Sequence, residues 1–270
     1  EALEMYRSLG EMTHDSKPEL RWRIQWGLGR TAMSLDQVDI ALASLKEACQ
    51  LKPGFFALHR DLAEASLRAN LQQEALDAAA NALQISPDDV DVLIWYADFV
   101  ASAGDKQKAV EALERAVQLD PCRADLFVRL AHWQLSAGDL NAARASLQSL
   151  LEMETATRQD LRRAAQIYMR LEDTASALAC FEMALKINSD ADAPESPANS
   201  LHFEVAQLQE RLGNLEAALE FSQCVLDDTP ESLPVYLFQS GLLARLDRPQ
   251  AAQALLERAL RIAGGDDEES

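Results

Sequence analysis

The sequence predicts an all-α protein in which about seven helix-turn-helix repeats stack into a solenoid, preceded by half a repeat at the N-terminus. Three observations carry this prediction. Prolines recur at a spacing of 34 residues, every repeat shares one alanine position, and nearly every repeat has a turn-forming residue at its middle. The composition agrees, because 45 of the 270 residues are alanine while 10 are glycine and 9 are proline, a balance that favours helices over sheets.

The spacing of prolines defines the repeat length. Pro53, Pro87 and Pro121 are 34 residues apart, and the next equivalent proline, Pro230, comes 109 residues after Pro121. Three periods of 34 account for 102 of those residues, so seven are extra, and the stretch DADAPESP is interpreted as their insertion. Without it, seven repeats fall into register: residues 22–55, 56–89, 90–123, 124–157, 158–191, 199–232 and 233–266.

Two positions of this register hold small residues throughout. The first is alanine in every repeat: Ala41, Ala75, Ala109, Ala143, Ala177, Ala218 and Ala252. Twelve residues earlier stand Gly29, Ala63, Ala97, Ala131, Ala165, Ala206 and Ser240. Two helices approach closely only where both present little side chain at the crossing, so we expect these two positions to meet inside each repeat.

A turn divides each repeat into two helices, with apolar residues at spacings of three and four on both sides. Six of the seven break positions hold residues that tolerate left-handed or turn geometry: Asp36, Asn70, Gly104, Gly138, Gly213 and Asp247. Glu172 takes this place in the fifth repeat, where we expect a turn of a different kind. The closing prolines follow the second helix, where the missing N–H matters least.

Together these features resemble the tetratricopeptide repeat, over residues 22 to about 263. The first repeat carries the resemblance in Leu28, Gly29, Ala41, Leu45, Ala48 and Pro53, and the second in Leu62, Ala63, Ala75, Ala82 and Pro87. Later repeats depart from the pattern, since Thr155 and Ser189 replace the proline and Gln239 replaces an apolar residue. The resemblance implies a right-handed superhelical solenoid that binds proteins, with the first helices on its concave face.

The expected organisation comprises five segments. Residues 1–21 are a partial N-terminal repeat and lead-in, 22–189 are repeats one to five, 190–198 are an insertion, 199–264 are repeats six and seven, and 265–270 are an acidic tail. The segment EALEMYRSL resembles the second helix of a further repeat and the chain does not begin with methionine, which indicates a truncated N-terminus.

Charge and composition limit the classes of partner that the chain can bind. With 44 acidic and 25 basic residues the net charge is −19, which repels phosphate backbones, so we predict no nucleic-acid partner. No apolar run reaches about 18 residues, so we predict no membrane insertion. The four cysteines form no close pair; we expect them to be small buried hydrophobes in a cytoplasmic protein. They are Cys49, Cys122, Cys180 and Cys224.

No motif indicates chemistry. Gly27 and Gly29 follow no strand, so they form no phosphate-binding loop, and the four histidines fall at no metal-binding spacing. No serine stands in a GxSxG turn, and no cysteine has a histidine beside it. We therefore predict a protein that is not an enzyme and holds no cofactor and no metal.

Partner binding is assigned to the concave face that the resemblance implies. Helical spacing places ten arginines, seven acids and no lysine on that face. Arginine suits bidentate capture of carboxylates, so the partner is expected to be another protein that presents an acidic or extended segment. The predicted contact residues are Arg60, Arg68, Trp95, Arg129, His132, Arg162, Arg163, Gln166, Arg170 and Phe203.

Two interpretations without a partner compete with this one. The arginines can pair with acids of their own helix, as Arg129 would with Asp125, and Trp26 and Trp95 can be covered by a neighbouring repeat. The lysines and asparagines of the family's clamp for chaperone tails are absent from the first helices. The leading function is an adaptor or assembly scaffold. The alternatives are a regulatory region of a larger enzyme or transcription regulator, and a cell-envelope assembly factor; homo-oligomerisation stays open.

Overall fold

The computed structural model describes residues 4–5, 8, 18–187 and 200–264. Within 18–187 and 200–264 the chain forms fourteen α-helices and no strand. The helices are α2 (Pro18–Ser34), α3 (Val38–Leu51), α4 (Phe56–Arg68), α5 (Gln72–Ile85), α6 (Val90–Ser102), α7 (Lys106–Leu119), α8 (Ala124–Ala137), α9 (Leu140–Leu151), α10 (Arg158–Arg170), α11 (Thr174–Lys186), α12 (Leu201–Arg211), α13 (Leu215–Asp228), α14 (Leu233–Arg245) and α15 (Pro249–Gly264). The predicted all-α class is confirmed.

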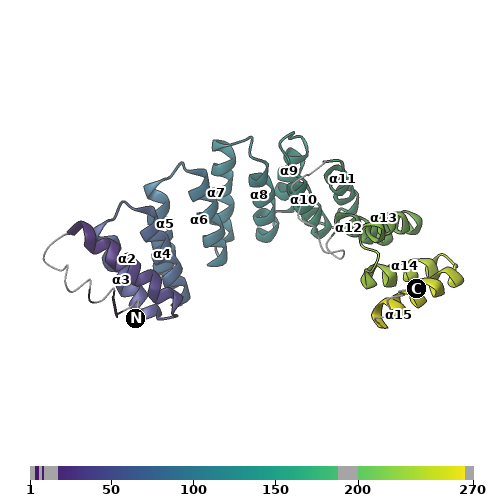
Figure 1. The fold of residues 1–270 in the computed structure, drawn as a ribbon. Coiled ribbons are helices and arrows are strands. Elements are labelled where there is room, and N and C mark those ends of the chain that lie inside the picture. The colour runs from purple at the N-terminus through teal and green to yellow at the C-terminus, as the bar shows by residue number, and fades with distance from the viewer. Residues whose placement is uncertain (1–3, 6–7, 9–17, 188–199, 265–270) are drawn as a thin grey trace. The chain divides into compact units, whose positions relative to one another are not determined.

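Each predicted repeat contributes two consecutive helices, from α2 and α3 in the first to α14 and α15 in the seventh (Figure 1). The first helix of the first repeat, α2, begins at Pro18, four residues before the expected start of that repeat. The predicted insertion at 190–198 and acidic tail at 265–270 lie outside the described residues, as does most of the lead-in at 1–21. For those segments the organisation stays a prediction.

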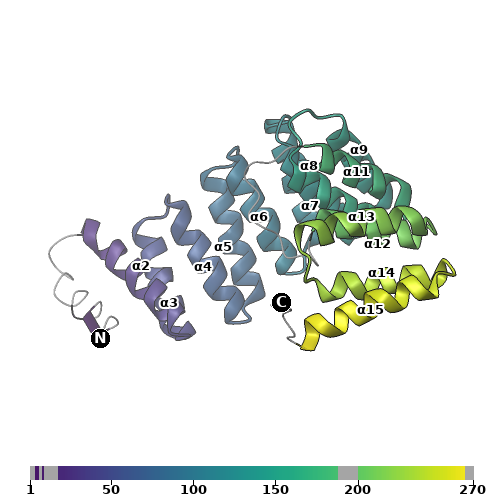
Figure 2. The ribbon, with the colours of Figure 1, turned by 45° about the vertical axis from the view of Figure 1, so that its right-hand side comes forward.

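The chain divides into two compact units, residues 1–143 and 144–270, and the division falls within α9. In the N-terminal unit each helix from α2 to α8 contacts the next one along the chain, and α2 to α6 stand side by side in that order (Figures 1 and 2). In the C-terminal unit α10 to α15 contact one another in the same order. Burial within each unit therefore comes from neighbours in sequence, as expected for stacked repeats.

All seven hairpin turns close in the same way. In each repeat, a residue one or two positions after the end of the first helix has a positive φ. These residues are Asp36, Asn70, Gly104, Gly138, Glu172, Gly213 and Asp247. The N–H of each and the N–H after it donate to two carbonyls of the helix's last turn, the Schellman pattern. In the fifth repeat Glu172 N–H lies 3.2 Å from Met169 O, and Asp173 N–H lies 3.0 Å from Tyr168 O. The expectation of a different turn there is wrong, because satisfying those carbonyls requires a left-handed residue whatever its side chain.

The shared small residues form a buried seam in every repeat. Six of the seven aligned alanines are 0% exposed and the last, Ala252, is 7% exposed. Their partners twelve residues earlier are also buried. In the first repeat a Cβ added to Gly29 would lie 2.6 Å from Leu45 Cγ and 3.4 Å from Ala41 O, so the two helices meet there at backbone distance. We call these two positions the alanine seam.

Gln239 stands where the repeat pattern has an apolar residue, and a second change of pattern in the repeat before it gives this glutamine a polar partner. Gln239 is 4% exposed on α14, and its Nε2 donates to Ser222 Oγ of α13 at 3.1 Å. Ser222 is itself 0% exposed and stands where Leu45 and Leu113 stand in other repeats. A buried amide needs a partner, so replacing the leucine by serine allows α13 and α14 to pack with a polar contact inside.

Candidate protein-binding face

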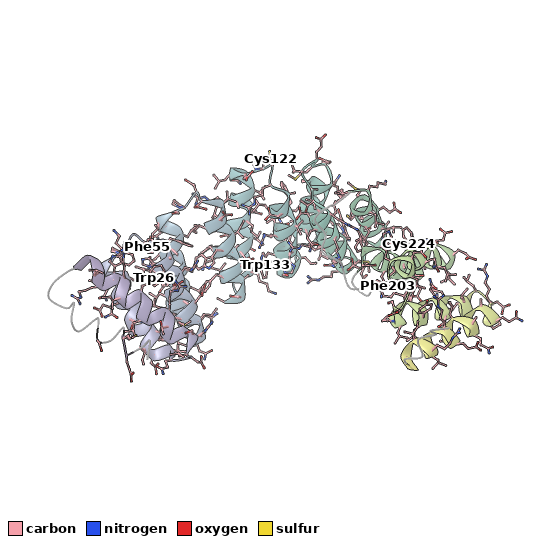
Figure 3. The ribbon with its side chains drawn as sticks, viewed as in Figure 1. Trp26, Phe55, Cys122, Trp133, Phe203 and Cys224 are labelled. Atoms are coloured by element: carbon pink, nitrogen blue, oxygen red, sulfur yellow. The ribbon has the colours of Figure 1, made fainter. Side chains whose placement is uncertain are left out.

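The candidate site lies on the exposed side of the first helices, which we call the first-helix face. It is formed by α2, α4, α6 and α8 in the N-terminal unit and by α10, α12 and α14 in the C-terminal unit. Figure 3 shows side chains along both units, with Trp26, Trp133 and Phe203 labelled on α2, α8 and α12. The two units are treated separately below.

In the N-terminal unit, Asp98 of α6 joins two side chains of the next first helix. Arg129 Nη1 lies 2.9 Å from Asp98 Oδ2, and Trp133 Nε1 donates to Asp98 Oδ1 at 3.3 Å. Arg129 Nε also lies 3.6 Å from Asp125 Oδ2 on its own helix. The guanidinium of Arg129 is thus held by two carboxylates, and the predicted pair with Asp125 is the longer of its two contacts.

Asp61 on α4 likewise joins a tryptophan and an arginine of a neighbouring first helix, in this case α2. Trp26 Nε1 donates to its Oδ2 at 2.6 Å, Arg60 Nη2 lies 3.0 Å from its Oδ1, and Arg30 Nε lies 3.9 Å from its Oδ2. Arg68 donates to the Met33 carbonyl at 3.3 Å. Asp61 is only 8% exposed, and three donors share its charge, so Arg60 is engaged within the chain.

The aromatic side chains of this unit pack within the chain. Trp26 meets Phe55 edge-on at 5.5 Å, and the two lie together in Figure 3. Trp95 is half-buried between Phe56 at 5.3 Å and Phe99 at 5.5 Å. The predicted contact residue His132 is half-buried and lies edge-on to the Trp133 ring at 4.8 Å. Phe56 belongs to the repeat before that of Trp95, and Trp26 packs in clusters with Leu62 of the next repeat. Both tryptophans are therefore partly covered by an adjacent repeat, as one of the two competing interpretations proposed.

In the C-terminal unit, Arg162 is a structural residue. Its Nε lies 2.8 Å from Glu204 Oε2, and the two side chains are only 16% and 22% exposed. Gln166 Nε2 donates to the other oxygen of Glu204 at 3.2 Å. Both carboxylate oxygens of α12 are therefore held by α10. This contact links the first helices of the fifth and sixth repeats, α10 and α12.

The next residue, Arg163, has the opposite surroundings. Arg163 and Arg170 are exposed on α10, and within the described residues neither has an ion-pair or hydrogen-bond partner. They lie seven residues apart, which places them on the same side of the helix two turns from one another. Arg211 of α12 is also exposed, with its Nη1 4.0 Å from the Met169 sulfur. We call Arg163, Arg170 and Arg211 the arginine patch.

Phe203 is not on the surface. It is 5% exposed and packs edge-on against Phe238 at 5.2 Å, in a cluster with Val225 and Val235. Its expected role as an apolar anchor for a partner therefore needs correction, because the packing of α12 against α14 turns the ring into the core. Gln207, one turn further along α12, is exposed instead.

The cysteines divide into two classes. Cys49 and Cys180 are buried, and burial raises the pKa of their thiols to about 11 and about 12, with smaller contributions from the nearby carboxylates of Asp61 and Asp173. Cys122 and Cys224 are exposed, on the loop before α8 and on α13 (Figure 3). The expectation of four buried cysteines is wrong for these two, because Cys122 lies in a loop and Cys224 lies on the exposed side of α13.

Sequence reasoning missed the residues that decide which arginines are engaged. Asp98 and Glu204 are two of the seven acids that helical spacing predicts on this face, but the pairing that the sequence suggested was with acids of the same helix. The pairs run to the next repeat instead, at separations of 31 residues for Asp98 with Arg129 and 42 for Arg162 with Glu204, the latter lengthened by the insertion. A search for opposite charges one repeat apart could have found them.

The described residues contain no cluster of histidine, cysteine and carboxylate side chains that could hold a metal ion. None of the helices placed by the structure is both long enough and apolar enough to cross a membrane.

Comparison with models of known protein families finds two matches to this chain. Two models described as tetratricopeptide repeat match it, one over residues 27–90 and 162–232 and the other over 72–125. The chain belongs to the tetratricopeptide repeat family. Tetratricopeptide repeats generally mediate interactions between proteins; they are typically non-catalytic, and no catalytic family is indicated. No curated protein matches this sequence.

Several solved structures share the fold at low identity. A tetratricopeptide repeat protein from Parabacteroides merdae ATCC 43184 has a TM-score of 0.53 and 15% identity, and the match covers 93% of this chain and 95% of that one. YrrB, described as having an unusual peptide-binding site, has a TM-score of 0.51 and 17% identity, covering 70% and 93%. PilF of Pseudomonas aeruginosa has a TM-score of 0.50 and 16% identity, covering 83% and 99%.

Proposed function

We propose that this tetratricopeptide repeat protein is an adaptor or assembly scaffold that binds an acidic segment of another protein at the arginine patch. One observation carries the proposal. In a chain of net charge −19, Arg163 and Arg170 are exposed on one side of α10 without an acid to pair with in the described part of the chain. The other predicted arginines are engaged: Arg60, Arg129 and Arg162 each contact a carboxylate, and Arg68 contacts a carbonyl.

The chemistry of arginine supports an acidic partner. A guanidinium presents a planar fork of N–H donors that matches a carboxylate, and the bidentate contact is among the stronger hydrogen bonds in proteins. Two such groups two helical turns apart suit an extended segment with two acids. Because the patch is exposed, its attraction is screened by salt, so capture should weaken as ionic strength rises.

The test is an affinity capture from the native organism, followed by mass spectrometry, with two charge-reversed variants. R163E/R170E alters only exposed residues of the patch. K52E/K106E makes the same change in net charge on exposed lysines after α3 and in α7, away from the first-helix face. We expect the first variant to lose the main partner and the second to keep it. Equal recovery by both would contradict the proposal.

We also propose the cytoplasm as the compartment. The four cysteines are free thiols, and two of them are exposed, which suits a reducing environment.

A further inference from the structure

Met169 on α10 lies beside the arginine patch and contacts one of its members. Arg211 Nη1 of α12 lies 4.0 Å from the Met169 sulfur, and Met169 is half-buried, so its side chain is partly open to solvent. Among the methionines that the structure describes, Met169 is the one whose sulfur contacts a guanidinium. The others are Met5, Met33, Met153 and Met183.

The weakness of this contact leaves Arg211 available to a partner. A thioether sulfur is a weak acceptor, and 4.0 Å is a long separation for a hydrogen bond to it. Arg211 is exposed and has no carboxylate partner among the described residues. Its guanidinium therefore keeps its donors for an acidic segment, as Arg163 and Arg170 do.

The same two places of the repeat hold a methionine and an arginine in the N-terminal unit. Met33 and Arg68 stand in the first and second repeats where Met169 and Arg211 stand in the fifth and sixth. Arg68 Nη1 donates to the backbone carbonyl of Met33 at 3.3 Å, while the Met33 side chain packs in an apolar cluster with Leu42. An oxygen thus holds the arginine in the N-terminal unit, whereas sulfur is the acceptor in the C-terminal unit.

Oxidation of a thioether supplies such an oxygen at the sulfur. With hydrogen peroxide as the oxidant, the sulfur lone pair attacks one peroxide oxygen, so that an S–O bond forms and the O–O bond breaks. The sulfur loses two electrons, and the other oxygen leaves as water with both hydrogens. The product, methionine sulfoxide, is polar and is reduced again by methionine sulfoxide reductases. A sulfoxide oxygen that faces a guanidinium accepts a charge-assisted hydrogen bond from it.

We propose that Met169 is a peroxide-sensitive site whose sulfoxide binds Arg211 and thereby weakens the capture of an acidic segment at the arginine patch. This role rests on the function proposed above for that patch. Arg211 is then held by the sulfoxide as Arg68 is held by the Met33 carbonyl, and its donors on that side no longer reach the partner's carboxylate. The two arginines of α10 keep their donors, so oxidation weakens capture and does not abolish it.

The probe is hexaglutamate that carries a fluorophore, and fluorescence anisotropy measures its binding to the full chain before and after treatment with hydrogen peroxide. We expect oxidation of the wild type to weaken binding about threefold or more, because a charged donor is withdrawn from the patch. Treatment with methionine sulfoxide reductases should restore the affinity. Mass spectrometry measures the extent of oxidation at Met169.

Two leucine variants identify the methionine that is responsible. Met169→Leu keeps an apolar side chain of similar volume that forms no sulfoxide, so we expect the same affinity before and after peroxide. Met183→Leu makes the same change on α11, where the side chain is 36% exposed, and should lose affinity on oxidation as the wild type does. An equal response of the two variants to peroxide would overturn the assignment to Met169.

Arg211→Ala tests the contact itself. This variant should bind hexaglutamate more weakly than the wild type from the start, and peroxide should weaken it no further, because the residue that the sulfoxide holds is gone. Met169→Gln places an amide oxygen near Arg211 without peroxide and should lower the affinity, whereas Met183→Gln should not. A further fall in affinity of Arg211→Ala on oxidation would contradict the proposal.

Two results separate this role of Met169 from the function proposed for the arginine patch. If the reduced wild type binds hexaglutamate and oxidation leaves the affinity unchanged, the patch stands and the role of Met169 is wrong. If the reduced wild type does not bind, the patch is wrong, and the NMR signal of the Arg211 Nε–H group decides whether the sulfoxide contact exists. This signal should shift on oxidation in the wild type and in Met183→Leu, but not in Met169→Leu.

Discussion

The first-helix faces of the two units carry similar residues in different states. In the N-terminal unit Arg60 and Arg129 are held by Asp61 and Asp98, and the tryptophans pack on neighbouring rings. In the C-terminal unit Arg162 is held by Glu204, while Arg163 beside it has no ion-pair partner among the described residues. The difference teaches that the count of charges on a face does not say which of them can reach a partner.

The largest expected effect tests what the two units share. Ala109→Trp in the N-terminal unit and Ala218→Trp in the C-terminal unit each insert an indole into the alanine seam, where the native side chain is 0% exposed. Overpacking should lower the free energy of unfolding by about 3 kcal/mol in both. Thermal melts followed by circular dichroism measure it, with the exposed Ala145→Trp on α9 as control. A mild effect in only one unit would mean that the seam is not equivalent in the two.

The second prediction sharpens the contrast between adjacent arginines. Arg162→Ala leaves the largely buried Glu204 without its guanidinium, so we expect a loss of about 2 kcal/mol in urea unfolding. Arg163→Ala removes an exposed side chain and should change stability by less than about 0.5 kcal/mol. If both variants unfold at the same urea concentration, Arg162 does not act as the structural residue of the pair.

A smaller effect is expected at the hairpin turns, where one unit has a glycine and the other a glutamate at the left-handed position. Glu172 has a φ of 57°, whereas Gly138 fills the same place in the fourth repeat with a φ of 92°. Glu172→Gly should stabilise the chain by about 1 kcal/mol, because it relieves a left-handed non-glycine residue. Gly138→Ala should destabilise it by a similar amount through backbone strain alone, since an added Cβ meets nothing within 4 Å. Equal melting temperatures for wild type and both variants would contradict this account.

The smallest effect is a pH dependence expected from the C-terminal unit. Burial of His202 on α12 lowers the pKa of its imidazole below 6.5; nearby Arg158 lowers it further, while Asp228 opposes the shift. The unfolded chain then binds the proton more readily, so this contribution to stability is present above pH about 6.5 and is lost as the pH falls below it. His202→Asn should show a smaller fall in melting temperature between pH 7.5 and 5.5 than the wild type. An equal fall would assign the pH dependence to other groups.

Local chemistry explains which elements of the fold were predictable. The 34-residue period, the alanine seam and six of the seven turns follow from residue types whose preferences act within one helix or one hairpin. Glu172 was misread because the Schellman closure, a property of the helix end, outweighed the preference of the residue. Exposure of Cys122 and Cys224 was not predicted, because it depends on where α7 ends and on which side of α13 faces its neighbours.

The candidate site was predictable only in outline. Helical spacing placed Arg162 and Arg163 on the correct helix, but it could not separate them, since Glu204 comes from a helix 42 residues away. Burial of Phe203 could not be predicted either, because its ring is covered by Phe238 of α14, a helix of the next repeat.

By itself the sequence determined that the chain is a stack of seven helix hairpins, because each hairpin is specified by residues within about 34 positions of one another. Only the tertiary structure decided which side chains remain available. Leu45 and Leu256 occupy the same place in their repeats, yet one is 0% and the other 41% exposed. The reason is physical: burial and ion pairing are properties of what packs next to a residue, and that neighbour lies in another repeat.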